Sequence, residues 1–275
     1  MQEKEIFEKE VLVIEKPKGL FDSGIPGFIL DKVYMELSFY RKEDSLHISY
    51  GCEINPRIYR LTTFLDPLAS GKTRLIWTGN YDNYSPYASK FAVTLNKFRN
   101  YLRFSNGDII VDKDFRGLGL GSYIYGRLIE LIKNDSYVKQ VGEENISVSE
   151  PYLSPVDETP DNKDRRNCFY IKFGFQLEGE RAFVKNLKYL TPCYNPNRFV
   201  VIKNKTLEEV VETEENFLKT LKEKLLKDSE RNRGNIGQNY FSVAESCYFC
   251  FLGILVELSN LPFRIIEFLR RIFKV

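Results

Sequence analysis

The segment 116–122, with the sequence RGLGLGS, constrains this chain more than any other part of it. It places three glycines in five positions, between an expected strand that ends in DIIV at 108–111 and a stretch with helical apolar spacing at Ile124, Leu128, Leu131 and Ile132. Glycine accepts positive φ and lets a ligand approach the backbone closely. A helix that begins there leaves its first N–H groups without intrahelical partners and carries partial positive charge. The pattern therefore predicts a turn that binds an anion such as a pyrophosphate.

The spacing of these glycines separates the turn from two common phosphate-binding motifs. A P-loop requires Gly-x4-Gly-Lys-Ser/Thr, and no lysine follows Gly121. The dinucleotide fingerprint requires Gly-x-Gly-x-x-Gly, whereas this chain has Gly-x-Gly-x-Gly with Arg116 in front. The alternative is a glycine-rich passage from strand to helix that binds nothing.

Around this turn, the pattern of apolar and turn-forming residues predicts an α/β (α+β) domain that ends near residue 203. Asn106-Gly107 is a strong hairpin signal, and the Glu178-Gly179 pair suggests a second turn. A short helix before Gly174 is expected to stop at that glycine. We expect strands within 28–41, 45–54, 75–80, 101–111, 144–150 and 175–187, and helices over 86–98, after the glycines to 134, over 164–173 and over 206–228.

The composition changes after residue 203, which divides the chain into 1–203 and a helical extension over 204–275. The extension begins with a charged amphipathic helix, continues through a polar linker, and ends in an apolar and then basic segment over 240–275. An uncharged run at 248–256 is too short to span a bilayer. The final segment has two alternatives: packing or oligomerisation, which we favour, and contact with a membrane surface.

Composition limits the class of protein and its partners. The 275 residues carry a formal net charge of +2, so no strong field favours nucleic acid. Five cysteines without a regular framework, and a charged start without a signal peptide, predict a cytoplasmic protein. The pair Cys247 and Cys250 lacks the further ligands that a structural zinc needs, so we expect no metal.

Two segments together resemble the GNAT superfamily of N-acetyltransferases. The first, over 111–122, resembles the acetyl-CoA-binding motif of that family, and the second, over 164–175, is similar to its second motif. The resemblance implies a mixed, mostly antiparallel central sheet flanked by helices. The matching positions are Val111, Asp112, Phe115, Arg116, Gly117, Gly119, Gly121 and Ser122 in the first segment, and Asn167, Tyr170, Gly174 and Phe175 in the second.

The resemblance also implies where acetyl-CoA, as co-substrate, would bind. The pyrophosphate would lie on the backbone amides of the glycine turn, and the pantetheine arm would pair with the strand before it, where the neighbouring strands separate. Asn167 of the second motif would contribute to the same site. The implied binding residues are thus Ile109, Ile110, Val111, Arg116, Gly117, Leu118, Gly119, Leu120, Gly121, Ser122 and Asn167.

For catalysis, the resemblance implies that Tyr170 protonates the leaving thiolate, although Tyr170 could also be an ordinary core aromatic. The base that takes the proton of the amine stays open between Glu150, Asp108 and Glu53, or a chain of waters, and His47 is a weaker candidate. The acceptor would be an amine of a small molecule or a protein. The alternative function is that of a CoA-binding interaction protein, which acts through its C-terminal helices at a partner or membrane surface.

Overall fold

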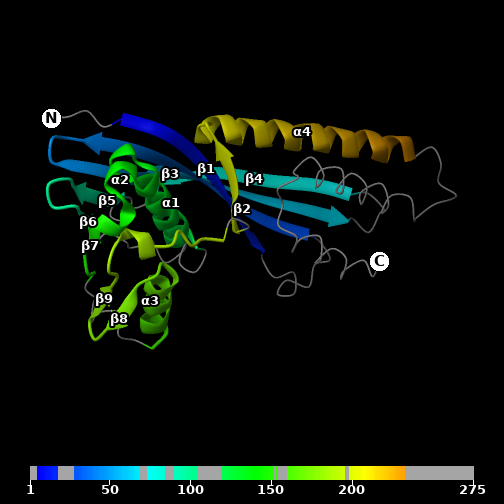
Figure 1. Ribbon diagram of the computed structural model, residues 1–275. Coiled ribbons are helices and arrows are strands. Elements are labelled where there is room, and N and C mark those ends of the chain that lie inside the picture. Colours follow the sequence, from blue (N-terminus) through cyan, green and yellow to red (C-terminus); the bar gives the residue numbers. More distant parts are fainter. Residues whose placement is uncertain are drawn as a thin grey trace. The chain divides into compact units, whose positions relative to one another are not determined.

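The computed structural model describes residues 5–17, 28–67, 73–83, 90–104, 119–151, 153, 160–195 and 198–232 (Figure 1). Within these residues the chain forms ten strands, four α-helices and two short 3₁₀ helices. The strands are β1 (Glu5–Pro17), β2 (Phe28–Glu43), β3 (His47–Pro67), β4 (Thr73–Asn83), β5 (Lys90–Asn96), β6 (Tyr101–Phe104), β7 (Ser147–Val148), β8 (Gln176–Glu178), β9 (Arg181–Phe183) and β10 (Val200–Lys203). The helices are α1 (Leu120–Asn134), α2 (Ser136–Val141), α3 (Pro160–Lys172), α4 (Leu207–Asn232), η3 (Glu143–Asn145) and η5 (Leu187–Tyr189).

The described strands form one large sheet and one small one. The large sheet has the order β10-β1-β2-β3-β5-β6-β7, with β4 paired to β3, and the second sheet contains β8 and β9. Strand β5 is antiparallel to both β3 and β6, whereas β7 is parallel to β6. The prediction of a mixed α/β protein with a mostly antiparallel sheet is therefore confirmed.

Contacts divide the chain into two compact units. Unit 1 comprises 1–10, 36–56 and 83–196, and unit 2 comprises 11–35, 57–82 and 197–275. The three long strands β1, β2 and β3 contribute a segment to each unit, because the division falls within them. Helices α1, α2 and α3 belong to unit 1 and α4 belongs to unit 2.

In unit 2 the apolar stripe of α4 packs on the sheet. Thr206 and Glu209 form a capping box, because each backbone N–H donates to the side chain of the other at 2.7 and 3.3 Å. Trp77 of β4 packs against the edge of the resulting core, and Lys222 lies 5.3 Å from the centroid of the indole ring. The core consists of Val11, Val13, Tyr34, Tyr59, Leu61, Leu75, Leu207, Val210, Val211 and Leu218.

In unit 1 helix α1 packs against β5, as Figure 1 shows. The predicted apolar stripe is buried except for Leu131, which is half-buried, and Tyr123, Tyr125 and Ile129 are buried with it. Helix α1 lies in the connection from β6 to the parallel strand β7, and a crossover between parallel strands usually contains a helix.

The sequence patterns predicted most elements correctly, but the helix expected over 86–98 is wrong. Residues 90–96 form strand β5, in which Phe91, Val93 and Leu95 are fully buried with a period of two. The proline and apolar spacing that suggested a helix do not determine the structure here, because β5 pairs with strands on both sides. Strands β1 and β10 and helix α2 were not predicted. In β1 a charged beginning is followed by a continuous buried run over 11–14, which lacks the alternation of a half-buried strand.

Candidate functional site

Seven of the predicted site residues belong to the part of the chain that the structure describes. Gly119, Leu120, Gly121 and Ser122 lie at the start of α1, Asn167 and Tyr170 lie on α3, and Glu150 follows β7. Seven others lie outside the described residues, together with the hairpin signal at 106–107, the cysteine pair at 247 and 250 and the segment 240–275. These seven are Asp108, Ile109, Ile110, Val111, Arg116, Gly117 and Leu118.

Helix α1 begins on a backbone conformation that favours glycine. Its N-cap residue Gly119 has φ 92°, ψ 5°, which places it in the left-handed region. No side chain caps the first turn, and the first turn contains no acidic residue. The first-turn N–H groups and the partial positive charge of the helix end are therefore suited to an anion.

The parallel strands β6 and β7 change their mode of pairing near their ends. Leu102 pairs with Val148, and the backbone N–H of Ser149 donates to the carbonyl of Leu102 at 2.7 Å. At the next pairing position, the N–H of Phe104 donates to the side-chain Oγ of buried Ser149 at 3.4 Å. A side-chain oxygen thus takes the place of a backbone carbonyl at Phe104, the last residue of β6. The backbone hydrogen bonds between β6 and β7 do not continue at this point.

Five aromatic rings connect β6, α1 and α3 in a closed circuit. Phe104 stacks on Tyr125 of α1 at a centroid distance of 5.5 Å, and Tyr125 contacts Phe169 of α3 edge-on at 5.5 Å. Tyr170 then makes edge contacts with Phe169 and Phe175, each at 5.5 Å, and Phe175 returns to Phe104 at 6.1 Å. This aromatic circuit places the second predicted motif beside the helix that begins at the first one.

The end of α3 explains the glycine and phenylalanine of the second motif. Gly174 has φ 94°, and a Cβ atom built there would lie 2.2 Å from the carbonyl oxygen of Tyr189, so only glycine fits. The N–H of Phe175 donates to the carbonyl of Tyr170 at 3.1 Å, which closes the last turn. The predicted stop of this helix at Gly174 is confirmed, and it fixes the half-buried Tyr170 between two rings.

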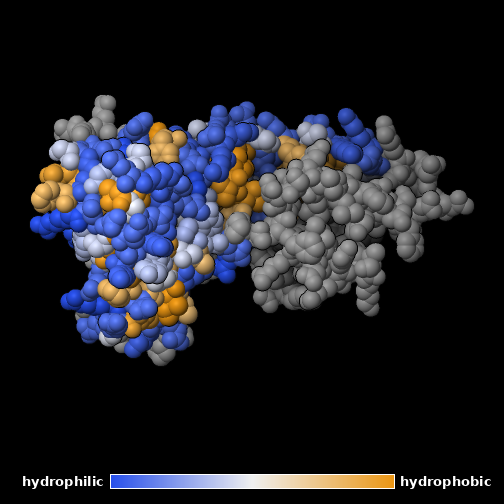
Figure 2. Space-filling view, viewed as in Figure 1, coloured by the Kyte–Doolittle hydropathy of each residue, from blue (hydrophilic) through white to orange (hydrophobic). Residues whose placement is uncertain are grey.

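The described side chains of α3, Asn167 among them, include both polar and apolar groups. The Oδ1 atom of half-buried Asn167 accepts a hydrogen bond from Nε of Arg166 at 3.3 Å. Ile171 is 57% exposed, and Figure 2 shows apolar side chains gathered over this helix. Helix α3 therefore offers both polar and apolar groups at its surface.

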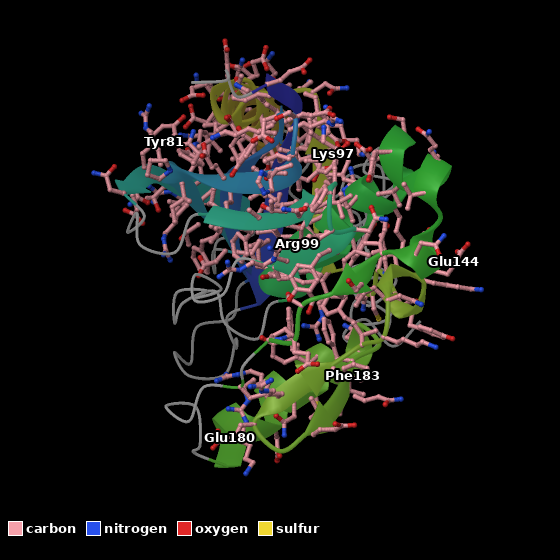
Figure 3. The ribbon with its side chains drawn as sticks, turned by 60° about the vertical axis from the view of Figure 1, so that its left-hand side comes forward. Tyr81, Lys97, Arg99, Glu144, Glu180 and Phe183 are labelled. Carbon is pink, nitrogen blue, oxygen red and sulfur yellow. The ribbon has the colours of Figure 1, made fainter. Side chains whose placement is uncertain are left out.

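Glu150 lies beside the β8–β9 hairpin, which Glu180 and Phe183 mark in Figure 3. Its Oε2 atom accepts from Nη1 of Arg181 at 3.2 Å, and both side chains are exposed. Two backbone bonds hold the neighbouring segment to the same hairpin, from Ala182 to Pro151 at 3.0 Å and from Leu153 to Glu180 at 2.7 Å. Glu150 thus takes part in an exposed ion pair beside this hairpin.

The other two described base candidates, His47 and Glu53, both lie on strand β3. His47 lies beside the β2–β3 turn, with Nδ1 3.4 Å from Asp44 Oδ1 and Nε2 3.2 Å from Asn96 Nδ2. Glu53 faces Lys90 in the register of β3 with β5. Burial, followed by the charge of Glu53, raises the pKa of Tyr40. These contacts give His47 and Glu53 structural roles within the hairpin and sheet.

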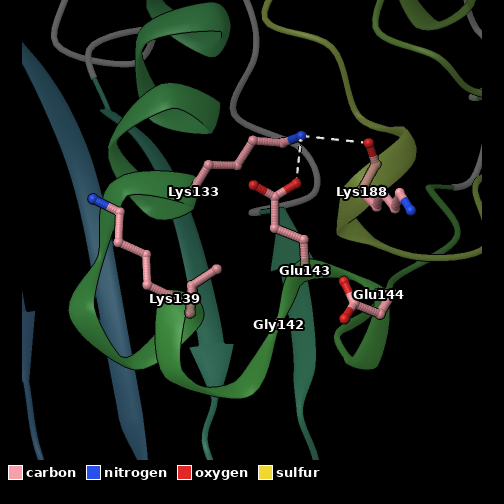
Figure 4. A pocket seen from close by; sticks show the side chains of 7 residues that line it. Lys133, Lys139, Gly142, Glu143, Glu144 and Lys188 are labelled. Carbon is pink, nitrogen blue, oxygen red and sulfur yellow. Dashed lines mark hydrogen bonds and ion pairs between the residues drawn. The ribbon is translucent and has the colours of Figure 1, made fainter.

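A surface pocket of about 340 Å³ lies at the opposite end of α1 from Gly119 (Figure 4). The ammonium of Lys133 bonds Glu143 at 2.9 Å and the carbonyl of Lys188 at 3.5 Å across this pocket. Lysine and glutamate charges are thus mixed along its wall, and none of the predicted site residues lines it. The lining residues are Lys133, Val138, Lys139, Gly142, Glu143, Glu144 and Lys188.

Phe104 and Tyr125 were missed by sequence reasoning, although both contribute to the aromatic circuit. Phe104 alternates with Leu102 as a buried residue of β6, a signal that the sequence carried. Tyr125 adjoins Ile124 of the apolar stripe, and its contact with α3 requires the tertiary structure. Periodicity therefore indicates that these residues are buried but does not identify the rings that they contact.

Comparisons with protein-family models, with curated proteins and with solved structures found no match to this chain. Within the described part of the chain, no group of three or more His, Cys, Asp or Glu side chains is arranged to hold a metal ion. None of the described helices combines the length and the apolar content needed to cross a membrane.

Proposed function

We propose that this chain is an N-acyltransferase that moves an acetyl group from acetyl-CoA to a primary amine of a small molecule or a protein. The observation that carries the proposal is the start of α1 on Gly119, with φ 92°, no side-chain cap and no acidic residue in the first turn. Such a helix end suits the diphosphate of coenzyme A. The sequence motif over 111–122 resembles the acetyl-CoA-binding motif and ends in this turn.

Two further features support the proposal. Helix α1 lies between the parallel strands β6 and β7 in the chain. At Phe104 the backbone of β6 bonds to the side chain of Ser149 instead of to its backbone carbonyl. A strand whose neighbour no longer provides its backbone partners can pair with the amide-bearing pantetheine arm instead. The aromatic circuit brings Tyr170, from the second motif, into the same region as Phe104.

At the thioester carbonyl carbon the reaction would form one bond and break one bond, and two proton transfers would accompany these changes. The neutral amine nitrogen attacks the thioester carbonyl carbon, the new C–N bond forms, and the C–S bond breaks. The proton of the amine passes to a base, for which Glu150 and Asp108 are the proposed residues, and the leaving thiolate takes a proton from the hydroxyl of Tyr170. The contacts of Tyr170 with Phe169 and Phe175 would hold this donor in place.

Calorimetric titration of the full chain with acetyl-CoA tests the proposal. We expect saturable binding by the wild type and an affinity at least about tenfold weaker for Gly119→Ala, because a Cβ atom at positive φ strains the start of the helix. Gly179→Ala is the matched control, since Gly179 also has positive φ, in the β8–β9 turn, and no neighbour lies within 4 Å of its added Cβ. If the wild type does not bind acetyl-CoA, the proposed function is wrong.

The reaction itself is tested by thiol release. A panel of small amines and lysine peptides is incubated with the protein and acetyl-CoA, and free coenzyme A is measured with a thiol reagent. Amine-dependent release at a rate above that of thioester hydrolysis is expected. Binding of acetyl-CoA without release for any amine in the panel would favour the interaction-protein alternative.

A further inference from the structure

The first turn of α1 is tied to strand β1 by a buried hydrogen bond. Tyr123 lies next to Ser122 in the chain, and its hydroxyl donates to Oε2 of Glu10 at 2.6 Å. Glu10 is fully buried and Tyr123 is 3% exposed. Both residues belong to unit 1, so the bond lies within one compact body.

Arg127 compensates the buried charge of Glu10 one turn further along the helix. Its guanidinium lies 3.6 Å from Glu10 Oε1, 2.7 Å from Glu8 Oε2 and 2.8 Å from Glu130 Oε2. The carboxylate of Glu10 therefore has a tyrosine on one oxygen and an arginine near the other. Burial, followed by the hydrogen bond to Glu10, raises the pKa of Tyr123, so its hydroxyl stays protonated as a donor.

This arrangement fixes position more than it adds stability. A buried ion pair gains little over an apolar core of the same shape, because both charges lose their water. A directional bond of this kind does specify where the two elements meet. The bond joins β1 to the residue that directly follows Gly121 and Ser122, two of the predicted pyrophosphate-binding residues.

We infer that Glu10 and Tyr123 are a positioning pair that sets the first-turn amides of α1 for the diphosphate of coenzyme A. This inference rests on the proposed function, since it assigns the pair to the same site. Neither residue touches the reacting atoms. They act through the backbone of the helix start, whose amides would bind the ligand directly.

The variant Tyr123→Phe tests the pair, because it removes only the hydroxyl. Calorimetric titration with coenzyme A should show an affinity roughly five- to tenfold weaker than that of the wild type. Hydrogen–deuterium exchange, measured by mass spectrometry without ligand, should be faster for the peptide that contains residues 119–123. The exchange measurement is independent of the ligand and reports the helix start itself.

Tyr50→Phe is the matched control for a merely structural effect. The buried hydroxyl of Tyr50 also donates to a buried carboxylate, Asp135 Oδ2 at 2.8 Å, beyond the C-terminal end of α1. This variant should lower the unfolding midpoint by a similar amount and leave the affinity for coenzyme A unchanged. Tyr194→Phe, which removes a bond to Glu130 at 3.0 Å, should also leave that affinity unchanged.

The possible results separate the inference from the function that it assumes. If the wild type binds coenzyme A and Tyr123→Phe binds equally well, with unchanged exchange at 119–123, the positioning pair is wrong and the proposed function stands. If Tyr50→Phe weakens binding as much as Tyr123→Phe does, the effect is one of general stability and the inference is also overturned. If the wild type itself does not bind, both are overturned.

Discussion

Two side chains of the candidate site differ in how firmly their surroundings hold them. Tyr170 lies between the rings of Phe169 and Phe175, and its carbonyl accepts the bond that closes α3. Glu150 instead makes an exposed ion pair with Arg181, a kind of contact that contributes little to stability. The geometry at Tyr170 is therefore set by packing, whereas Glu150 takes part in an exposed ion pair that holds it less firmly.

The first prediction at this scale concerns the phenolic hydroxyl. Tyr170→Phe keeps the ring and its two edge contacts, so the affinity for acetyl-CoA in calorimetry should remain close to that of the wild type. Turnover in the thiol-release assay should fall on the order of a hundredfold, because the leaving thiolate loses its proposed proton donor. Tyr189→Phe, at a tyrosine that is 56% exposed, is the control. An unchanged turnover number would remove Tyr170 from the mechanism.

The second prediction concerns the half-buried carboxylate of Glu15 in unit 2. Burial raises the pKa of Glu15; Lys32 opposes this shift and Glu214 adds to it. Because the folded pKa lies above the unfolded value, the folded state loses stability as pH rises from the unfolded pKa through the folded pKa. Glu15→Gln should therefore increase the free energy of unfolding at pH 7 and reduce this loss. Lys32 keeps its bond to Glu214 at 2.9 Å in the variant.

Urea unfolding between pH 4 and pH 8 measures both effects of this change. Glu212→Gln makes the same substitution at an exposed position of α4 and serves as the control. A lower free energy of unfolding for Glu15→Gln at pH 7 would mean that the charge of Glu15 stabilises unit 2, contrary to the expectation.

At the scale of elements, the sequence predicted secondary structure correctly where the local pattern of residues agrees with the tertiary surroundings. The helices α1, α3 and α4 and the strands β2 and β3 were predicted from periodicity, residue composition and the stop at Gly174. Strand β5 was not, because its alternation becomes decisive only when strands pair on both of its sides. The glycine turn predicted the start of α1, but not that Tyr123 is bonded to a residue more than one hundred positions earlier.

The capping box of α4 gives a prediction at the same scale. Thr206→Ala should lower the free energy of unfolding by about 1 kcal/mol, because the N–H of Glu209 loses its side-chain acceptor. Thr213→Ala is the matched control, since the hydroxyl of Thr213 donates within the helix, to the carbonyl of Glu209 at 2.8 Å. Urea unfolding followed by far-ultraviolet circular dichroism distinguishes the two. Equal losses for both variants would argue against the cap.

At the scale of the whole chain, each unit is assembled from separate stretches of sequence. Unit 2 combines parts of β1, β2 and β3 with β4, β10 and α4, so its core depends on residues on both sides of position 203. Composition indicated a change at 203, but it could not show that α4 completes a core with Val11, Tyr34 and Leu61. Such pairings are long-range, and local sequence patterns do not contain them.

Truncation tests this dependence. A chain ending at residue 203 should fail to unfold cooperatively, because it loses four buried side chains of α4, which together contribute roughly 6–12 kcal/mol. That loss is comparable with the whole stability of a typical domain. A chain ending at 232 retains α4 and should give a cooperative thermal transition. A cooperative transition for the shorter chain would show that residues 1–203 are self-sufficient.

The position of Trp77 has a practical consequence for following this protein in solution. Trp77 is the sole tryptophan of the sequence, and it packs against the core that α4 covers, with Lys222 near the indole ring. Tryptophan fluorescence, excited at the red edge of the protein's absorption band, therefore reports locally on the packing of α4 against its strands. The aromatic circuit around Tyr170 contains only tyrosine and phenylalanine and is silent in that channel, so the two regions can be monitored optically without attaching a dye.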